Sequence, residues 1–177
     1  MKCFLRLAVL GTVVCLALPA SAQILRPTSD DGGEILRVAR VAELELDLPV
    51  DAETAYDAWT VVTELVEWLP HWADMTVDVD SGFSMGWDGY DGVWTGTYLE
   101  VERPERLVFT WVVPEGVFPS GSYETTVSVT FEETDEGRTT MLLEHRGFRD
   151  AAEMESQLLS WRGYMFALRA HLLRATR

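Results

Sequence analysis

Three histidines are the residues of this sequence best suited to acid–base chemistry. His145 follows Met141 and Leu143 at every second position, the spacing of residues that share one face of a β-strand. On an inward face, His145 could act as a general base or hydrogen-bond the polar end of a ligand. A structural histidine is the simpler interpretation, because no nucleophile or orienting aspartate lies near it in the sequence. His145 is therefore a weak candidate, and the only one, for a catalytic residue.

The sequence offers no recognisable metal or cofactor site. Both cysteines, Cys3 and Cys15, lie within the first 22 residues, and the histidines form neither an HxxxH nor an HExxH pattern. Residues 78–82 faintly resemble a calcium loop, but Phe83 replaces the glycine and Gly89 replaces the glutamate that such a loop requires. We therefore expect no metal ion and no cofactor.

Seven tryptophans are the most informative aromatic residues, and six of them lie between positions 59 and 111. Tryptophan buries a large area yet usually keeps its N–H near a polar partner. Core packing is the expectation for Trp59 and Trp161. Trp68, Trp72 and Trp87 could instead form the rim of a pocket for an apolar or ring-shaped ligand. The residues expected to contact such a ligand are Trp68, Trp72, Trp87, Trp111, Met141, Leu143, His145, Met154, Leu158, Trp161 and Met165.

A long amphipathic helix over residues 149–174 would supply one wall of that pocket. Its apolar stripe recurs in steps of four and three residues, with Tyr164 and Phe166 beside it. The stripe consists of Met154, Leu158, Trp161, Met165, Leu168 and Leu172. A helix of this kind must bury its stripe against the strand-like segments that precede it.

Those segments predict an α+β fold with an antiparallel sheet of about seven strands. A first strand ends at Leu48, and two short helices follow, with Asp51 and Thr63 as candidate N-caps. The other expected strands are residues 76–80, 83–87, 93–102, 107–113, 123–132 and 138–145. Strands grouped together before a terminal helix favour helices packed on one face of the sheet, and a sheet this wide can curl around one helix.

Residues 1–22 have the pattern of a secretory signal peptide. Lys2 and Arg6 precede an apolar run over residues 7–18, and a small-residue cleavage pattern ends at Ala22. We expect cleavage there, a flexible tether over residues 23–34 and a single domain over residues 35–177. The apolar run is too short for stable membrane insertion, so the mature protein should be periplasmic or secreted.

The charge balance excludes one class of partner. The chain has 29 acidic and 14 basic residues, a net charge of −15. Such a surface repels nucleic acid and anionic membranes and favours solubility.

Four stretches resemble a known family, the START-like (SRPBCC) superfamily and its branch named for the activator of the heat-shock-protein-90 ATPase. The stretches are LPVDAETAYDAWTVVTELVEW at 48–68, GTYLEVERPERLVFTW at 96–111, RTTMLLEHRGF at 138–148 and Ser160-Trp161 followed by Leu168. The resemblance implies a helix-grip fold with a cavity between the curved sheet and the long helix. It carries over no catalytic set, because the family has no universal one.

Three functions remain open from the sequence. The first is an exported protein that binds a small hydrophobic molecule between sheet and helix without chemistry. The second is an enzyme of the cyclase or dehydratase type that uses His145 in the cavity. The third is a protein-interaction module, such as an envelope co-chaperone, that uses the acidic sheet surface and has a filled interior.

Overall fold

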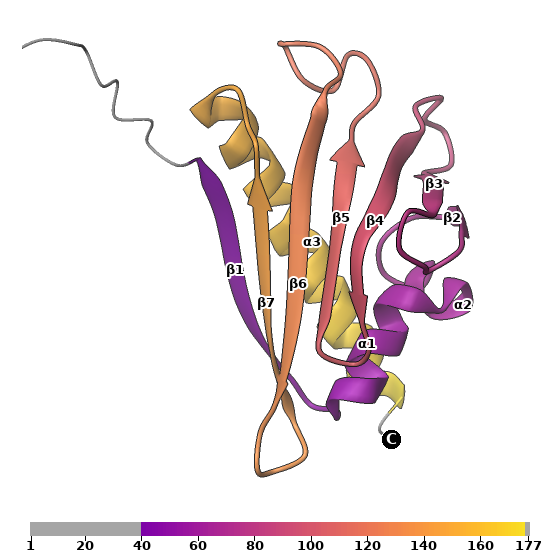
Figure 1. The fold of residues 1–177 in the computed structure, drawn as a ribbon, viewed down its shortest axis with the longest axis vertical. Helices are drawn as coiled ribbons and strands as arrows, with labels where there is room; N and C mark the ends of the chain where they lie inside the picture. The colour runs from indigo at the N-terminus through magenta and orange to yellow at the C-terminus, as the bar shows by residue number, and fades with distance from the viewer. Residues whose placement is uncertain (1–39, 176–177) are drawn as a thin grey trace, which may run out of the picture. The chain divides into compact units, whose positions relative to one another are not determined.

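The computed structural model describes residues 40–175, so the expected signal peptide and tether lie outside the described residues. Within that range the elements follow the expected order, and Figure 1 shows them. They are β1 (Val41–Leu48), α1 (Ala52–Thr60), α2 (Val62–Leu65), β2 (Trp72–Met75), β3 (Gly82–Gly86), β4 (Trp94–Glu102), β5 (Arg106–Val112), β6 (Glu124–Glu133), β7 (Thr139–Arg146) and α3 (Ala151–Ala175).

All seven strands join one antiparallel sheet in the order β1-β7-β6-β5-β4-β3-β2. The first strand therefore pairs with the last, with Ala42 opposite His145 and Leu44 opposite Leu143. This pairing places the strand that precedes α1 beside the strand that leads into α3 (Figure 1). The expected α+β fold with a seven-stranded antiparallel sheet is confirmed.

The core lies between one face of the sheet and the helices. Strict alternation along β6 buries Thr125, Val127, Val129 and Phe131 and turns the residues between them outward. On β7 the same alternation buries His145. The inward orientation inferred from the spacing of His145 is therefore correct.

The two short helices are held differently at their starts. Asp51 caps α1 as expected, because its carboxylate accepts a 2.7 Å hydrogen bond from the Thr54 backbone N–H. The expected cap at Thr63 is wrong, since α2 begins after Val61 without a side-chain cap. Because α2 spans one turn, its stability comes from packing, chiefly of the buried Leu65.

The long helix α3 begins at Ala151, and the Asp150 carboxylate accepts a 2.9 Å bond from the Glu153 N–H. Its inner face carries the expected stripe from Trp161 to Leu172, but the first turns differ. Glu153 and Gln157 are buried there, whereas Met154 and Leu158 are half-buried at the edge of the core. The placement of Phe166 beside the inner stripe is wrong, because 78% of this residue is exposed. No helix within residues 40–175 combines the length and apolar character needed to cross a membrane.

The second strand differs most from the expectation. It spans Trp72–Met75 and not residues 76–80, and it pairs with β3 at the edge of the sheet. The sequence pattern misses this because the segment after Met75 turns through Asp80, whose φ of 66° lies in the left-handed region. The Asp80 N–H donates to the Tyr98 carbonyl at 2.9 Å, which holds the turn against β4.

Candidate functional site

The interior between sheet and helices contains a small apolar void. Its volume is about 10 Å³, close to the minimum needed for one water molecule. The void is lined by Trp59, Leu65, Leu69, Phe83, Met85, Tyr98, Leu107, Phe109 and Trp111. A pocket for a drug-sized ligand has at least roughly 300 Å³, so this void does not hold such a molecule in the geometry described.

Of the residues expected to contact a ligand, only Trp111 lines this void. Trp68 is buried beside it and donates its indole N–H to the Ala58 carbonyl at 2.9 Å. Its ring centroid lies 4.8 Å from that of Trp59 in an edge-on contact. Trp68 therefore fixes the end of α1 against the segment after α2. Neither His145 nor Trp68 lines this void, although a cavity between the sheet and the long helix was expected to connect them.

The other expected rim residues lie toward the surface. Trp72 is 40% exposed and covers Gly86, where an added Cβ would come within 2.7 Å of the indole ring. Trp87 is half-buried, donates its indole N–H to the Leu69 carbonyl at 2.8 Å, and packs edge-on against Trp94. These side chains serve local packing around the end of α2.

The remaining expected contacts belong to the packed core or to its edge. Met141, Leu143, Trp161 and Met165 are buried, and Met154 and Leu158 pack at the border of the core. Contact of these residues with a ligand stays a prediction.

His145 is completely buried in a hydrogen-bonded chain with a defined direction. The Trp161 indole, which can only donate, gives its N–H to Nδ1 of His145 at 3.0 Å. The proton of the neutral ring therefore sits on Nε2 and is donated to Oγ1 of Thr125 at 2.7 Å. Thr125 in turn donates to the Trp111 carbonyl at 2.7 Å. Both ring nitrogens are thus occupied by protein groups.

Burial lowers the pKa of His145 to about 3, because the charged ring would lose its hydration without gaining an acid partner. Protonation at Nδ1 would also set two donors, His145 and Trp161, against each other. His145 is therefore a neutral structural histidine at neutral pH. It has no free nitrogen for a substrate, and the geometry gives no support to the cyclase or dehydratase hypothesis.

Within residues 40–175, three buried polar side-chain groups have no hydrogen-bond partner: the indole N–H groups of Trp59 and Trp111 and the hydroxyl of Tyr56. Both indoles belong to residues that line the 10 Å³ void. An unpaired buried donor costs about 1–3 kcal/mol, so these groups are the unusual feature of the interior. Sequence reasoning did not find them, because tryptophan content alone does not show which N–H groups lack an acceptor.

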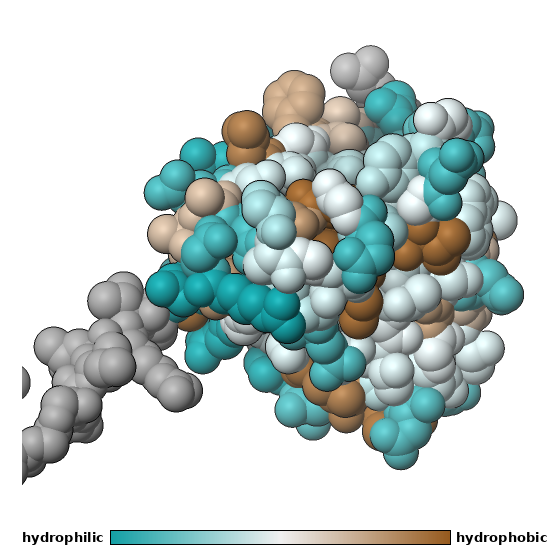
Figure 2. All heavy atoms as spheres, turned by 90° about the horizontal axis from the view of Figure 1, so that it is seen from above, coloured by the Kyte–Doolittle hydropathy of each residue, from teal (hydrophilic) through white to brown (hydrophobic). Residues whose placement is uncertain are grey.

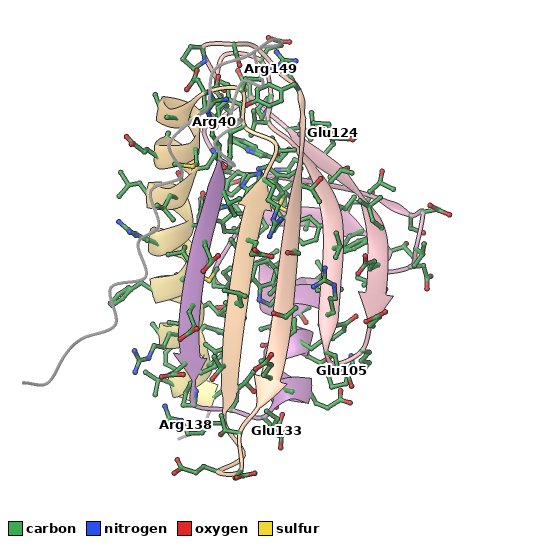
Figure 3. All side chains as sticks on the ribbon, turned by 60° about the vertical axis from the view of Figure 1, so that its left-hand side comes forward. Arg40, Glu105, Glu124, Glu133, Arg138 and Arg149 are labelled. Carbon is green, nitrogen blue, oxygen red and sulfur yellow. The ribbon has the colours of Figure 1, made fainter. Side chains whose placement is uncertain are left out.

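A larger hollow lies outside the core, where the β4–β5 turn meets the end of β6. It has a volume of about 550 Å³ and is open to solvent. Four glutamates line it, namely Glu102, Glu105, Glu132 and Glu133, together with Ala52, Pro104, Arg106, Thr130 and Phe131. Figure 3 shows Glu105 and Glu133 at the same end of the sheet. We call this feature the acidic hollow.

A second hollow of about 380 Å³ continues this acidic end around the β6–β7 hairpin. It is lined by Asp47, Thr134, Asp135, Glu136, Arg138 and Thr139. Figure 2 views the opposite end of the domain, where apolar residues form separate small areas among polar ones. Among residues 40–175, no group of three or more His, Cys, Asp or Glu side chains is placed to hold a metal ion.

At the opposite end of the domain, Glu153 attaches α3 to the loop between β5 and β6. Its carboxylate accepts bonds from the Ser120 N–H at 3.1 Å, the Ser120 hydroxyl at 2.5 Å and the Tyr123 hydroxyl at 2.7 Å. Burial acts to raise the pKa of Glu153, but these bonds and the charge of Arg149 outweigh it and lower the pKa. The Glu153 carboxylate is therefore a structural anion, and both of its oxygens accept hydrogen bonds from groups of this chain.

Comparison with known proteins supports the fold and the family. The model of the Activator of Hsp90 ATPase homolog 1-like protein family matches residues 49–172. A solved protein of Mesorhizobium loti is 24% identical with a TM-score of 0.68, covering 76% of this chain and 97% of its own. An Hsp90 activator from Plasmodium falciparum is 19% identical with a TM-score of 0.60, and the match covers 75% of this chain and 95% of the activator. The Aha1 dimer of Colwellia psychrerythraea is 18% identical with a TM-score of 0.61, and the match covers 75% of this chain and 95% of that one. No curated protein matches the sequence. These similarities confirm the helix-grip fold.

Proposed function

We propose that this chain, which belongs to the Activator of Hsp90 ATPase homolog 1-like protein family, is a protein-binding module that receives a basic segment of its partner in the acidic hollow. The family and fold are compatible with either ligand binding or a co-chaperone-type function. The observation that favours a protein partner is the acidic hollow itself, open at about 550 Å³ while the interior void has about 10 Å³.

The charges around the hollow suit a cationic side chain. Arg106, the basic residue of the lining, is already paired with Glu100 through a 2.7 Å contact of Nε. Because Arg106 is neutralised by Glu100, the four glutamates that line the hollow give it an excess of negative charge. Opposite charge on a partner would raise the association rate and select the partner, as charge complementarity does at protein interfaces.

The hollow also has a fixed frame. The Phe131 N–H donates to the Glu105 carbonyl at 2.8 Å, which ties the β4–β5 turn to β6. On the other side of the turn, Arg103 pairs with Glu53 and Asp57 of α1 at 2.6 and 2.7 Å. Because the turn is held from both sides, a partner would meet carboxylates whose backbone is already ordered.

Fluorescence anisotropy with a labelled arginine-rich peptide tests this function. We expect binding that weakens with salt and falls at least about fivefold in Glu105→Gln/Glu133→Gln. The matched control is Glu67→Gln/Asp91→Asn, which removes the same charge from exposed positions elsewhere. Equal loss in both double variants would show a response to net charge only and would contradict a site at the hollow.

A second candidate function, binding of a small apolar molecule that carries a hydrogen-bond acceptor, is favoured by the unpaired indoles of Trp59 and Trp111. An acceptor at the void would satisfy donors that the chain itself leaves unpaired. Titration with anilinonaphthalene sulfonate should then shift the indole N–H resonances of Trp59 and Trp111 in an NMR spectrum. The Trp68 resonance is the internal control, because its N–H is already bonded to Ala58. Unshifted Trp59 and Trp111 resonances would remove this candidate.

We also propose that the protein works outside the cytosol, on the basis of the signal-like residues 1–22. An exported relative would act on a partner other than a cytosolic ATPase. Mass spectrometry of the protein from its native host should show a mature chain that begins at Gln23. A full-length chain recovered from the cytosol would contradict export.

A further inference from the structure

We propose that the outer face of α3 is a self-association surface, on which a second copy of this chain packs with its own α3 antiparallel. The inner face of the helix is accounted for by the core. The outer face carries two large apolar side chains, Leu159 and Phe166, which are 71% and 78% exposed. Figure 3 shows α3 along one side of the sheet.

The small and apolar positions on this face follow a second heptad pattern, distinct from the buried one. They are Ala152, Ser156, Leu159, Gly163, Phe166 and Ala170, in steps of four and three residues. We call these six residues the outer seam. A seam of this spacing is the pattern by which one helix packs along another, with large residues fitting beside small ones.

Gly163 supports a close helix contact at the middle of the seam. A glycine inside a helix is less favourable than alanine, so it normally has a packing reason. Among the described residues 40–175, a Cβ at Gly163 would meet nothing within 4 Å. A helix crossing at Gly163 would supply the reason, because the missing side chain lets two backbones approach.

Charge on the flank of the seam selects the antiparallel arrangement and a second copy as the occupant. Glu155, Arg162 and Arg169 lie on the same flank, seven residues apart. In an antiparallel pair that crosses at Gly163, Glu155 stands about 12 Å before the crossing and Arg169 about 9 Å after it. The two side chains therefore reach each other across the pair, twice by symmetry. In a parallel pair this flank would instead face the opposite flank of the other copy, which carries Ser160 and Ala167, so neither Glu155 nor Arg169 would meet an opposite charge.

The same geometry predicts one unfavourable contact. Arg162 lies next to the crossing, so the two copies would bring their Arg162 side chains close together. A single helix pair also gives a small interface, below roughly 1,200 Å². We therefore expect a weak dimer that Arg162→Gln strengthens.

Sedimentation of the purified chain from about 1 μM to about 1 mM tests the proposal. The wild type should rise toward twice the monomer mass. Phe166→Glu and Gly163→Leu should each weaken dimerisation at least about tenfold, with circular dichroism confirming that both remain folded. The matched control is Val79→Glu, which changes a 53% exposed side chain between β2 and β3. This variant should dimerise like the wild type. A wild type that stays monomeric throughout, or seam variants that still dimerise, would overturn the proposal.

A charge exchange distinguishes a second copy from other occupants. Arg169→Glu should weaken the dimer and Glu155→Arg/Arg169→Glu should restore it, because only a second copy carries the compensating change. Loss without rescue, together with binding of the monomer to anionic phosphatidylserine vesicles, would assign the face to a membrane surface. Faster hydrogen exchange of residues 23–39 in monomeric Phe166→Glu would assign it to the N-terminal segment of the chain. Either result would overturn self-association.

Discussion

Acidification should destabilise this protein through His145, by about 2 kcal/mol between about pH 8 and about pH 5. The native ring is neutral because burial lowers its pKa to about 3, and Trp161 and Thr125 occupy its two nitrogens. In the unfolded chain the ring returns to its ordinary pKa of 6.5. The prediction rests on this difference between the two states.

The direction follows from proton binding. Between pH 6.5 and 3 the unfolded state holds one more proton than the native state, so lowering the pH favours unfolding. Above pH 6.5 His145 is neutral in both states, so its protonation does not lower the free energy of unfolding. Each pH unit below that value costs about 1.4 kcal/mol, so the 1.5 units to pH 5 cost about 2 kcal/mol.

Urea unfolding at several pH values, followed by tryptophan fluorescence, measures this slope. His145→Gln should be less stable at about pH 8 by about 1–3 kcal/mol, because the amide cannot reproduce both ring contacts. It should also lose the slope between about pH 6.5 and 5, a range in which most carboxylates remain ionised. His71→Gln is the matched control, since His71 is half-exposed and lies outside the hydrogen-bonded chain of His145.

An unchanged slope in His145→Gln would refute the reasoning. So would an NMR titration of the native protein that shows a pKa of His145 near 6.5. Either result would mean that the ring exchanges protons with solvent while the protein is folded. The hypothesis that His145 acts as a base on a bound molecule would then be open again.

Three further substitutions test other parts of the structure, each by its denaturation midpoint. Glu153→Gln should cost about 1–3 kcal/mol, since it weakens the anionic contacts that Tyr123 and the loop make with the start of α3. Tyr56→Phe should be neutral or slightly stabilising, because the deleted hydroxyl is buried without a partner. Arg103→Ala should cost no more than about 1 kcal/mol despite its contacts with α1, because the ion pairs are exposed and screened by solvent.

Local patterns predicted most of the fold. The steps of four and three residues in α3, the alternation in β6 and β7, and the cap at Asp51 each depend on neighbours in the sequence. The expectation failed where a contact distant in the sequence decides the result. β2 is set by its pairing with β3. At the start of α3, Glu153 is buried because its carboxylate bonds to Ser120 and Tyr123 in the segment between β5 and β6.

The candidate sites were harder to predict from the sequence, because they too are formed by residues that are distant in the sequence. Glu102 and Glu105 lie about thirty residues before Glu132 and Glu133. They meet only because the β5–β6 register places Arg106 opposite Thr130. Nothing in either segment alone marks a site. The composition did indicate an acidic surface, but the hollow that concentrates four carboxylates is a property of strand pairing.

The energetic cost of opening a cavity separates the two candidate functions. Expanding the interior void to the roughly 300 Å³ of a ligand pocket would cost about 7 kcal/mol at about 24 cal/mol per Å³. Domains of this size have a total stability of about 5–15 kcal/mol, so an open, empty interior would be populated very rarely. An interior ligand would therefore lose about five orders of magnitude of apparent affinity to opening, unless its own contacts repaid that cost. The acidic hollow is already open, and a basic segment binding there loses nothing to such a rearrangement. For the packing described, a surface partner is thus the energetically simpler occupant, and an interior ligand must be one that fills the space it opens.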